Sequence, residues 1–196
     1  MPKIYSTEER NNIIHRLKEE SRFCLQNYGV KGTTVDMLVK RVGIPKGTFY
    51  LFYKTKELLL FEVLLEQHEI IENNLYTALQ ALHNKVNVEN LTTVIFDFYK
   101  VIDESGILKL LTTGEIELLQ RKLPPALVQE HLVHDADMIN KIVDILSLPK
   151  KENIEYYSTA FLTLFLSVVY KREMGQEYFD EGLRLTIRGL VIQLIE

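Results

Sequence analysis

The chain has 196 residues, of which 46% are hydrophobic and 26% are charged, and a single cysteine, Cys24. This composition excludes a disordered chain, a disulfide-stabilised scaffold and an all-cysteine zinc site. The sequence contains no signal-peptide pattern and no apolar run long enough to span a membrane. We therefore expect a soluble cytoplasmic protein, with no membrane partner, that folds as one large domain or two smaller ones.

The net charge of −4 is distributed unevenly along the sequence. Residues 1–56 include 11 basic and 5 acidic residues, a net charge of +6, whereas residues 57–196 have a net charge of −10. A basic segment joined to an acidic one is typical of a protein whose first part binds a polyanion, and chance clustering of surface charges is the alternative. We place the domain boundary after Lys56.

Apolar residues recur at three- and four-residue steps through most of the sequence, which predicts an all-α fold. Ser6 and Glu9 have the spacing of a capping box, so we expect the first helix to start there and to end at Gly29. A second, short helix is expected between Thr33 and Gly43.

Pro45 suits the first turn of a short third helix that ends at Phe52, because proline lacks the N–H that would be unpaired there. A fourth helix is expected to open within the segment 54–57 and to run to Leu82. The remaining sequence predicts five longer helices, near residues 88–104, 107–119, 125–146, 153–172 and 176–195. Residues 1–56 should thus form a three-helix domain, and residues 57–196 a helical bundle.

The second and third predicted helices are joined by the tight turn 42–45, which is the arrangement of a helix-turn-helix. In this motif the second helix presents its first residues to base edges in the major groove. Lys46 and Thr48 can donate hydrogen bonds to bases or phosphate, and Gly47 allows the backbone to approach closely. Tyr50 can donate its hydroxyl to a phosphate, or it packs in the core.

Three further residues stand where a helix begins, a position that favours phosphate. Thr33 and Thr34 precede the second helix, and Lys56 lies at the start of the fourth. The alternative role for the threonines is helix capping, which does not exclude a phosphate contact.

Residues 28–59 contain several short motifs at fixed spacing. They are Tyr28-Gly29, Thr33-Thr34, Leu38-Val39, Gly43-Ile44-Pro45-Lys46-Gly47-Thr48-Phe49-Tyr50, Phe52-Tyr53 and Thr55-Lys56-Glu57. In these motifs the chain resembles the N-terminal DNA-binding domain of the TetR/AcrR family of transcriptional regulators. The resemblance implies DNA contacts by Thr33, Thr34, Lys46, Gly47, Thr48, Tyr50 and Lys56.

Three positions depart from the family pattern: Val39 replaces the usual alanine, Pro45 a common serine and Leu51 a frequent histidine or other polar residue. An apolar side chain at position 51 favours contact with a thymine methyl group. We therefore add Leu51 to the predicted DNA-contacting residues.

A short recognition helix reads only a few base pairs, so specificity requires two copies of the chain on a pseudo-palindromic operator. The last two predicted helices have wide apolar faces, which favour a four-helix dimer interface, as the resemblance also implies. The residues of this predicted interface are Phe161, Phe165, Val169, Leu183, Ile187, Leu190, Val191 and Leu194. The expected function is that of a homodimeric, ligand-responsive repressor of double-stranded DNA.

The C-terminal bundle of such a regulator is expected to bind a small-molecule effector. Its many apolar side chains suggest a hydrophobic molecule, although every bundle core is apolar. Thr112, Thr113 and Glu115 either line the effector pocket or form a loop and a helix cap.

The sequence predicts no catalytic residue, no cofactor and no metal site. His131, His134 and Asp137 do not share one face of a helix, so solvated side chains are the better interpretation. A helical protein-interaction scaffold that binds no DNA is the main alternative function, and a helical enzyme is the second. The basic N-terminal segment and the motif Lys46-Gly47-Thr48 favour the DNA-binding regulator over both.

Overall fold

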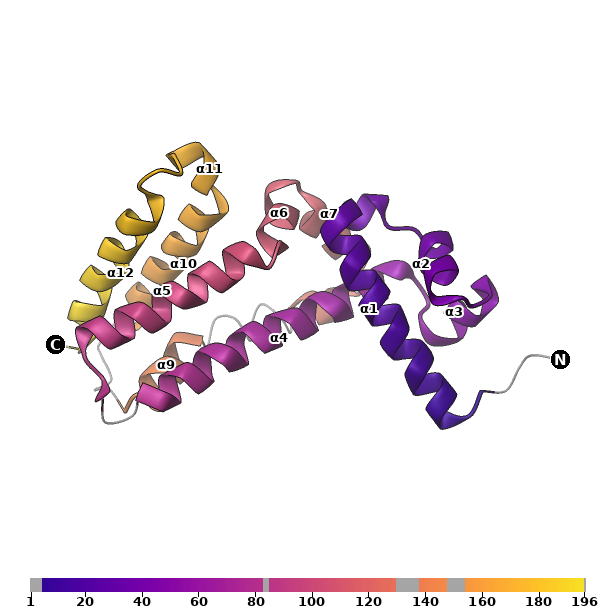
Figure 1. Ribbon diagram of the computed structural model, residues 1–196, viewed down its shortest axis with the longest axis horizontal. Helices are drawn as coiled ribbons and strands as arrows, with labels where there is room; N and C mark the ends of the chain where they lie inside the picture. Colours follow the sequence, from indigo (N-terminus) through magenta and orange to yellow (C-terminus); the bar gives the residue numbers. More distant parts are fainter. Residues whose placement is uncertain (1–4, 83–84, 130–137, 148–153, 196) are drawn as a thin grey trace. The chain divides into compact units, whose positions relative to one another are not determined.

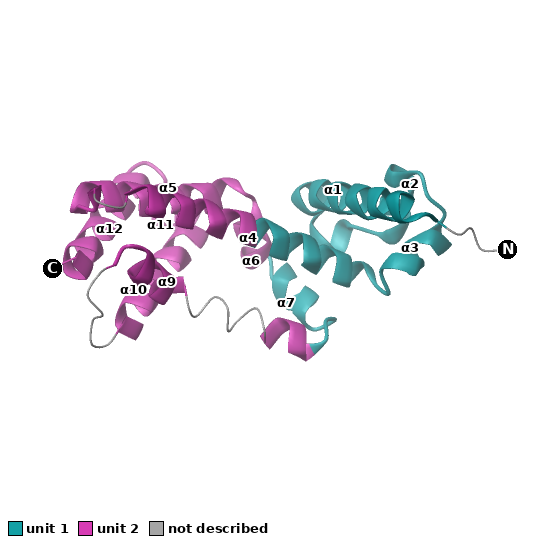
Figure 2. Ribbon diagram, turned by 90° about the horizontal axis from the view of Figure 1, so that it is seen from below, with its two compact units in different colours: residues 1–68, 113–124 teal, residues 69–112, 125–196 magenta. Residues whose placement is uncertain are grey.

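The computed structural model describes residues 5–82, 85–129, 138–147 and 154–195. Within these ranges the secondary structure is helical and contains no strand, so the predicted all-α fold is confirmed. The chain divides into two compact units (Figure 2). The amino-terminal unit comprises residues 1–68 and 113–124, and the carboxy-terminal unit comprises residues 69–112 and 125–196.

The amino-terminal unit begins with α1 (Thr7–Gly32), which starts and breaks where the sequence predicts. The Ser6 hydroxyl accepts a hydrogen bond from the Glu9 amide (3.2 Å), and the Glu9 carboxylate accepts one from the Ser6 amide (2.8 Å). Gly29 interrupts the helix with a φ of +68°, a left-handed conformation that glycine adopts without steric penalty. The chain then turns toward the next helix.

Helices α2 (Val35–Val42) and α3 (Lys46–Phe52) follow as the predicted helix-turn-helix (Figure 1). The Thr34 hydroxyl caps α2 by accepting a hydrogen bond from the Met37 amide (3.2 Å). Gly43 ends α2 with a φ of +75°. Pro45 is the N-cap of α3 and not a first-turn residue, so α3 begins one residue later than predicted and has no side-chain cap.

Helix α4 (Lys56–Leu82) contributes its first turns to the amino-terminal unit and the rest to the carboxy-terminal unit. Lys18 on α1 forms ion pairs with the carboxylates of Glu62 and Glu66 on α4, each at 2.6 Å. The core of the amino-terminal unit is built from fully buried side chains of these helices, including Leu17, Leu38, Phe49 and Leu60.

The amino-terminal unit also includes a segment that is distant in the sequence. Gly114, with a φ of +67°, divides the helix predicted over 107–119 into α6 (Ile107–Thr112) and α7 (Glu115–Gln120). Helix α7 contacts α1 and lies in the amino-terminal unit, whereas α6 lies in the carboxy-terminal unit.

Counted over these units, the net charge is +3 for the amino-terminal unit and −7 for the carboxy-terminal unit.

The carboxy-terminal unit is a helical bundle. Its further helices are α5 (Val88–Glu104), α9 (Met138–Ile145), α10 (Ile154–Val169), α11 (Lys171–Met174) and α12 (Phe179–Ile195). Helix α5 lies along α12, and α10 contacts α5, α9 and α12 (Figure 1). The bundle is tied internally by the Tyr99 hydroxyl, which donates a buried hydrogen bond to the Phe161 carbonyl oxygen (2.7 Å).

We predict that Tyr99→Phe lowers the free energy of unfolding by about 1 kcal/mol, because it removes this buried hydrogen bond. Tyr157→Phe is the matched control, since the Tyr157 hydroxyl donates to the Gln193 carbonyl oxygen at an exposed site (3.0 Å). The control should change stability by less than about 0.5 kcal/mol. Urea denaturation measures both free energies of unfolding. Equal destabilisation by the two substitutions would contradict a stabilising role for the buried Tyr99 hydrogen bond.

Candidate nucleic-acid interface

The candidate interface centres on α3, whose side chains divide between the core and the surface. Phe49 is completely buried. Four residues of α3 are exposed: Lys46, Gly47, Tyr50 and Leu51. They form two adjacent pairs that are one helical turn apart, so all four lie on one side of the helix. Burial of Phe49 therefore fixes which side of α3 faces solvent.

Lys46, the first residue of α3, forms an exposed ion pair with Asp36 on α2 (2.9 Å). The hydrogen bond to Asp36 raises the pKa of the Lys46 ammonium, which is therefore charged at neutral pH. Because both partners are exposed, water and salt screen the pair strongly. The Lys46 ammonium can consequently exchange Asp36 for a phosphate or a base edge.

Tyr50 and Leu51 supply the aromatic and aliphatic part of this surface. Their exposed fractions are 51% and 54%. Tyr50 contacts Phe49 edge-on, with ring centroids 5.3 Å apart, but the buried aromatic positions are those of Phe49 and Tyr53. Core packing thus does not account for Tyr50.

The three predicted threonines have different surroundings. Thr34 is exposed at the start of α2. Thr33 is buried, and its hydroxyl donates to the Gly29 carbonyl oxygen (2.6 Å). Thr48 is also buried, and its hydroxyl shares a hydrogen bond with the Tyr5 hydroxyl (3.0 Å).

Lys56 is half-buried at the start of α4 and binds backbone carbonyl groups at the end of α1. Its ammonium donates to the carbonyl oxygens of Val30 (2.7 Å) and Thr33. Burial lowers the pKa of Lys56, while the nearby carboxylates of Glu57 and Glu115 oppose this shift. In the free protein the Lys56 ammonium is therefore hydrogen-bonded to the backbone of its own chain.

The boundary between the two units falls among the residues predicted for the effector pocket, between Thr112 and Thr113. Thr112 is exposed, and its hydroxyl donates to the carbonyl oxygen of Lys109 on its own helix (3.1 Å). Thr113 and Glu115 belong to the amino-terminal unit, where the Glu115 carboxylate accepts a hydrogen bond from the Val30 amide (2.6 Å). This contact spans 85 residues of sequence, and no local pattern indicates it.

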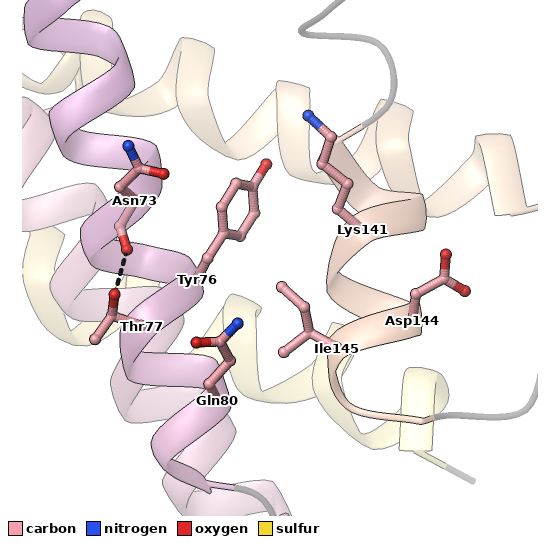
Figure 3. A pocket seen from close by; sticks show the side chains of 7 residues that line it. All are labelled: Asn73, Tyr76, Thr77, Gln80, Lys141, Asp144 and Ile145. Atoms are coloured by element: carbon pink, nitrogen blue, oxygen red, sulfur yellow. Dashed lines mark hydrogen bonds between the residues drawn. The ribbon is translucent and has the colours of Figure 1, made fainter.

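A cavity of about 510 Å³ lies elsewhere, within the carboxy-terminal unit, between α4 and α9 (Figure 3). The lining residues are Asn73, Tyr76, Thr77, Gln80, Lys141, Asp144 and Ile145. Six of these seven residues carry an amide, hydroxyl or charged group, and the Lys141 ammonium lies 5.8 Å from the centre of the Tyr76 ring. No sequence pattern marks these residues, since all but Ile145 are polar positions of two amphipathic helices.

The apolar faces of α10 and α12 are largely used inside the carboxy-terminal unit. Of the residues predicted for the dimer interface, five are buried there: Phe161, Leu183, Ile187, Val191 and Leu194. Phe165, Val169 and Leu190 are partly buried against the same core. Other apolar side chains of these helices remain exposed, namely Leu162, Leu166 and Leu185.

The residues that the structure describes contain no cluster of three potential metal ligands, and His131, His134 and Asp137 lie outside them. In the same part of the chain no helix is long and apolar enough to cross a membrane.

Residues 20–63, which include α2 and α3, match the family profile of the bacterial regulatory proteins, tetR family. Over this segment the chain is similar to the tetR family, and α2 and α3 form the corresponding helix-turn-helix. No curated protein matches the chain.

Solved structures of transcriptional regulators share the fold along nearly the whole chain. A Mesorhizobium loti protein, provisionally assigned as a TetR-family transcriptional regulator, has a TM-score of 0.69 at 14% identity, covering 96% of this chain and 98% of that one. FadR of Bacillus subtilis, in complex with stearoyl-CoA, has a TM-score of 0.58 at 16% identity, with 95% and 100% covered. Thermus thermophilus FadR, in complex with lauroyl-CoA, has a TM-score of 0.52 at 18% identity, with 93% of each chain covered.

We predict that Lys56→Met lowers the free energy of unfolding by about 1–3 kcal/mol, because two backbone carbonyls lose their charged donor. Lys54→Met removes the same charge from an exposed neighbour and should change stability by less than about 0.5 kcal/mol. Thermal unfolding compares the two. Equal stabilities would show that Lys56 has no structural role in the free protein.

Proposed function

We propose that this protein is a tetR-family repressor that binds a pseudo-palindromic operator as a homodimer and responds to a small-molecule effector. The observation that carries the proposal is the division of α3, in which buried Phe49 leaves Lys46, Tyr50 and Leu51 exposed together. A helix presented in this way suits insertion into the major groove.

Each exposed group of α3 has a chemical role in this proposal. Lys46 donates to base edges or phosphate, and Tyr50 donates its hydroxyl to a phosphate. Gly47 has no neighbouring atom within 4 Å of the position that a β-carbon would take, so its backbone is open to close approach. Leu51 contacts a thymine methyl group.

The remaining predicted contacts lie beside or beneath this surface. Thr34 and the first amides of α2 face a phosphate in the proposal. Thr33, Thr48 and Lys56 already have hydrogen-bond partners within the chain. We propose that the main role of these three residues is to position the backbone of α2 and α3. To contact a phosphate, each of them must exchange its present hydrogen-bond partner for the phosphate when DNA binds.

For the homodimer we propose the outward sides of α10 and α12. Leu162, Leu166 and Leu185 are 56%, 48% and 72% exposed, so both helices carry apolar side chains on the side that faces away from the core. Gly182 and Gly189 are exposed on the same side of α12 as Leu185 and permit close approach of a partner helix. Phe165, Val169 and Leu190 of the same helices are partly buried against the core of the unit.

For the effector we propose an amphipathic ligand of the carboxy-terminal unit. The cavity between α4 and α9 offers hydrogen-bonding groups and the Lys141 charge for a polar part, beside the apolar Ile145. The two FadR structures contain acyl-CoA molecules. Stearoyl-CoA and lauroyl-CoA are therefore the first compounds to test.

The direct test is selection of bound sequences from random double-stranded DNA by the full chain. We expect an inverted repeat whose half-sites lie about 34–36 Å apart or at a multiple of that spacing. Lys46→Ala and Tyr50→Phe should each weaken binding to the selected duplex about tenfold, as loss of one specific contact does. Lys109→Ala, an equal loss of charge in the carboxy-terminal unit, should leave the affinity unchanged. Failure to enrich any sequence would favour the scaffold alternative.

The dimer is tested separately by Leu166→Glu, which places a charge on the proposed interface. We expect monomers in sedimentation analysis, with unchanged helix content. Val101→Glu, at a similarly exposed apolar position on α5, should leave the dimer intact. A dimer that persists in Leu166→Glu would exclude this surface.

A further inference from the structure

Both backbone hydrogen-bonding groups of Val30, near the end of α1, are bound by side chains from elsewhere in the amino-terminal unit. The Val30 amide donates to the Glu115 carboxylate (2.6 Å), and the Val30 carbonyl oxygen accepts from the Lys56 ammonium (2.7 Å). Val30 is buried. It follows directly on Gly29, where the regular course of α1 is interrupted. The Glu115 and Lys56 side chains thus hold the backbone in place just after the helix is interrupted.

Gly29 makes the contact with Glu115 sterically possible. A β-carbon at position 29 would collide with the Glu115 carboxylate, and the φ of +68° would strain any larger residue. The glycine therefore supplies both the left-handed turn and the space that the carboxylate occupies. This fit argues that the Glu115 contact is a built part of the amino-terminal unit.

The segment that carries Glu115 has a second attachment at its other end. Lys122, just beyond α7, donates to the Glu57 carboxylate on α4 (3.0 Å). Burial would raise the pKa of Glu57, but the contact with Lys122 holds it below its ordinary value. Residues 113–124 are thus bonded to the amino-terminal unit at both ends, while the residues before and after them belong to the carboxy-terminal unit.

We propose that Glu115 is a positioning residue that holds the α1–α2 junction, and with it Thr34 and α3, in the arrangement that binds DNA. Because only two residues separate the end of α6 from Glu115, a movement of α6 withdraws the carboxylate from Val30. An effector that moves α6 then lowers DNA affinity through one hydrogen bond. This role rests on the proposed DNA-binding function.

The contact itself is tested without DNA, by amide hydrogen exchange of the full chain followed by NMR. Glu115→Ala should speed exchange of the Val30 amide about tenfold or more, and Glu115→Gln less, because it keeps an acceptor oxygen. The amide of Leu60 in the core should keep its rate. Glu117→Ala, an exposed carboxylate on the same helix, should change neither amide. Unchanged exchange at Val30, or equal acceleration at Leu60, overturns the proposal.

The positioning role is tested on the duplex that the wild-type chain selects. Glu115→Ala should bind it about tenfold more weakly than Glu117→Ala, which has the same net charge, with the same salt dependence. Faster Val30 exchange with unchanged DNA affinity overturns the positioning role. A wild-type chain that selects no DNA overturns the proposed function and the DNA part of this role, while the exchange experiment separately decides whether the contact exists.

Discussion

The burial of Phe49 is the constraint on which the DNA-facing surface depends. Helix α3 has seven residues, fewer than an isolated helix needs to be stable in water, and it has no side-chain cap. Its position must therefore come from packing of Phe49 and from contacts such as the hydrogen bond between Thr48 and Tyr5. Lys46 and Tyr50 can be presented to DNA only because the opposite side of the helix is fixed.

The elements that sequence predicted well are those with local causes. The capping box at Ser6 and the left-handed glycines Gly29 and Gly43 involve residues within four positions of each other, so their spacing alone indicates them. The partners of Lys56 and Glu115 lie 26 and 85 residues away, and no periodicity reports such contacts. Sequence placed Lys56 among the DNA contacts, where the free protein shows it bound to its own backbone.

The apolar faces of the last two helices show a different limit. Periodicity correctly indicated that α10 and α12 have wide apolar faces, but it cannot distinguish a residue that faces its own core from one that faces a partner. Ile187 is completely buried within the carboxy-terminal unit, whereas Leu185 on the same helix is largely exposed. The net charge of the unit that contains the helix-turn-helix is +3, because this unit also includes Glu57, Glu62 and Glu66 of α4, whereas residues 113–124 add no net charge.

The proposed DNA binding therefore depends on specific exposed cations rather than on a strongly basic unit. The decisive measurement is the equilibrium affinity of the full chain for its selected duplex across a range of salt concentrations. We expect a linear fall of log K with log salt concentration, with a slope of about −0.9 for each phosphate neutralised and a shallower slope for Lys46→Ala. An affinity that is independent of salt would contradict the proposed DNA binding.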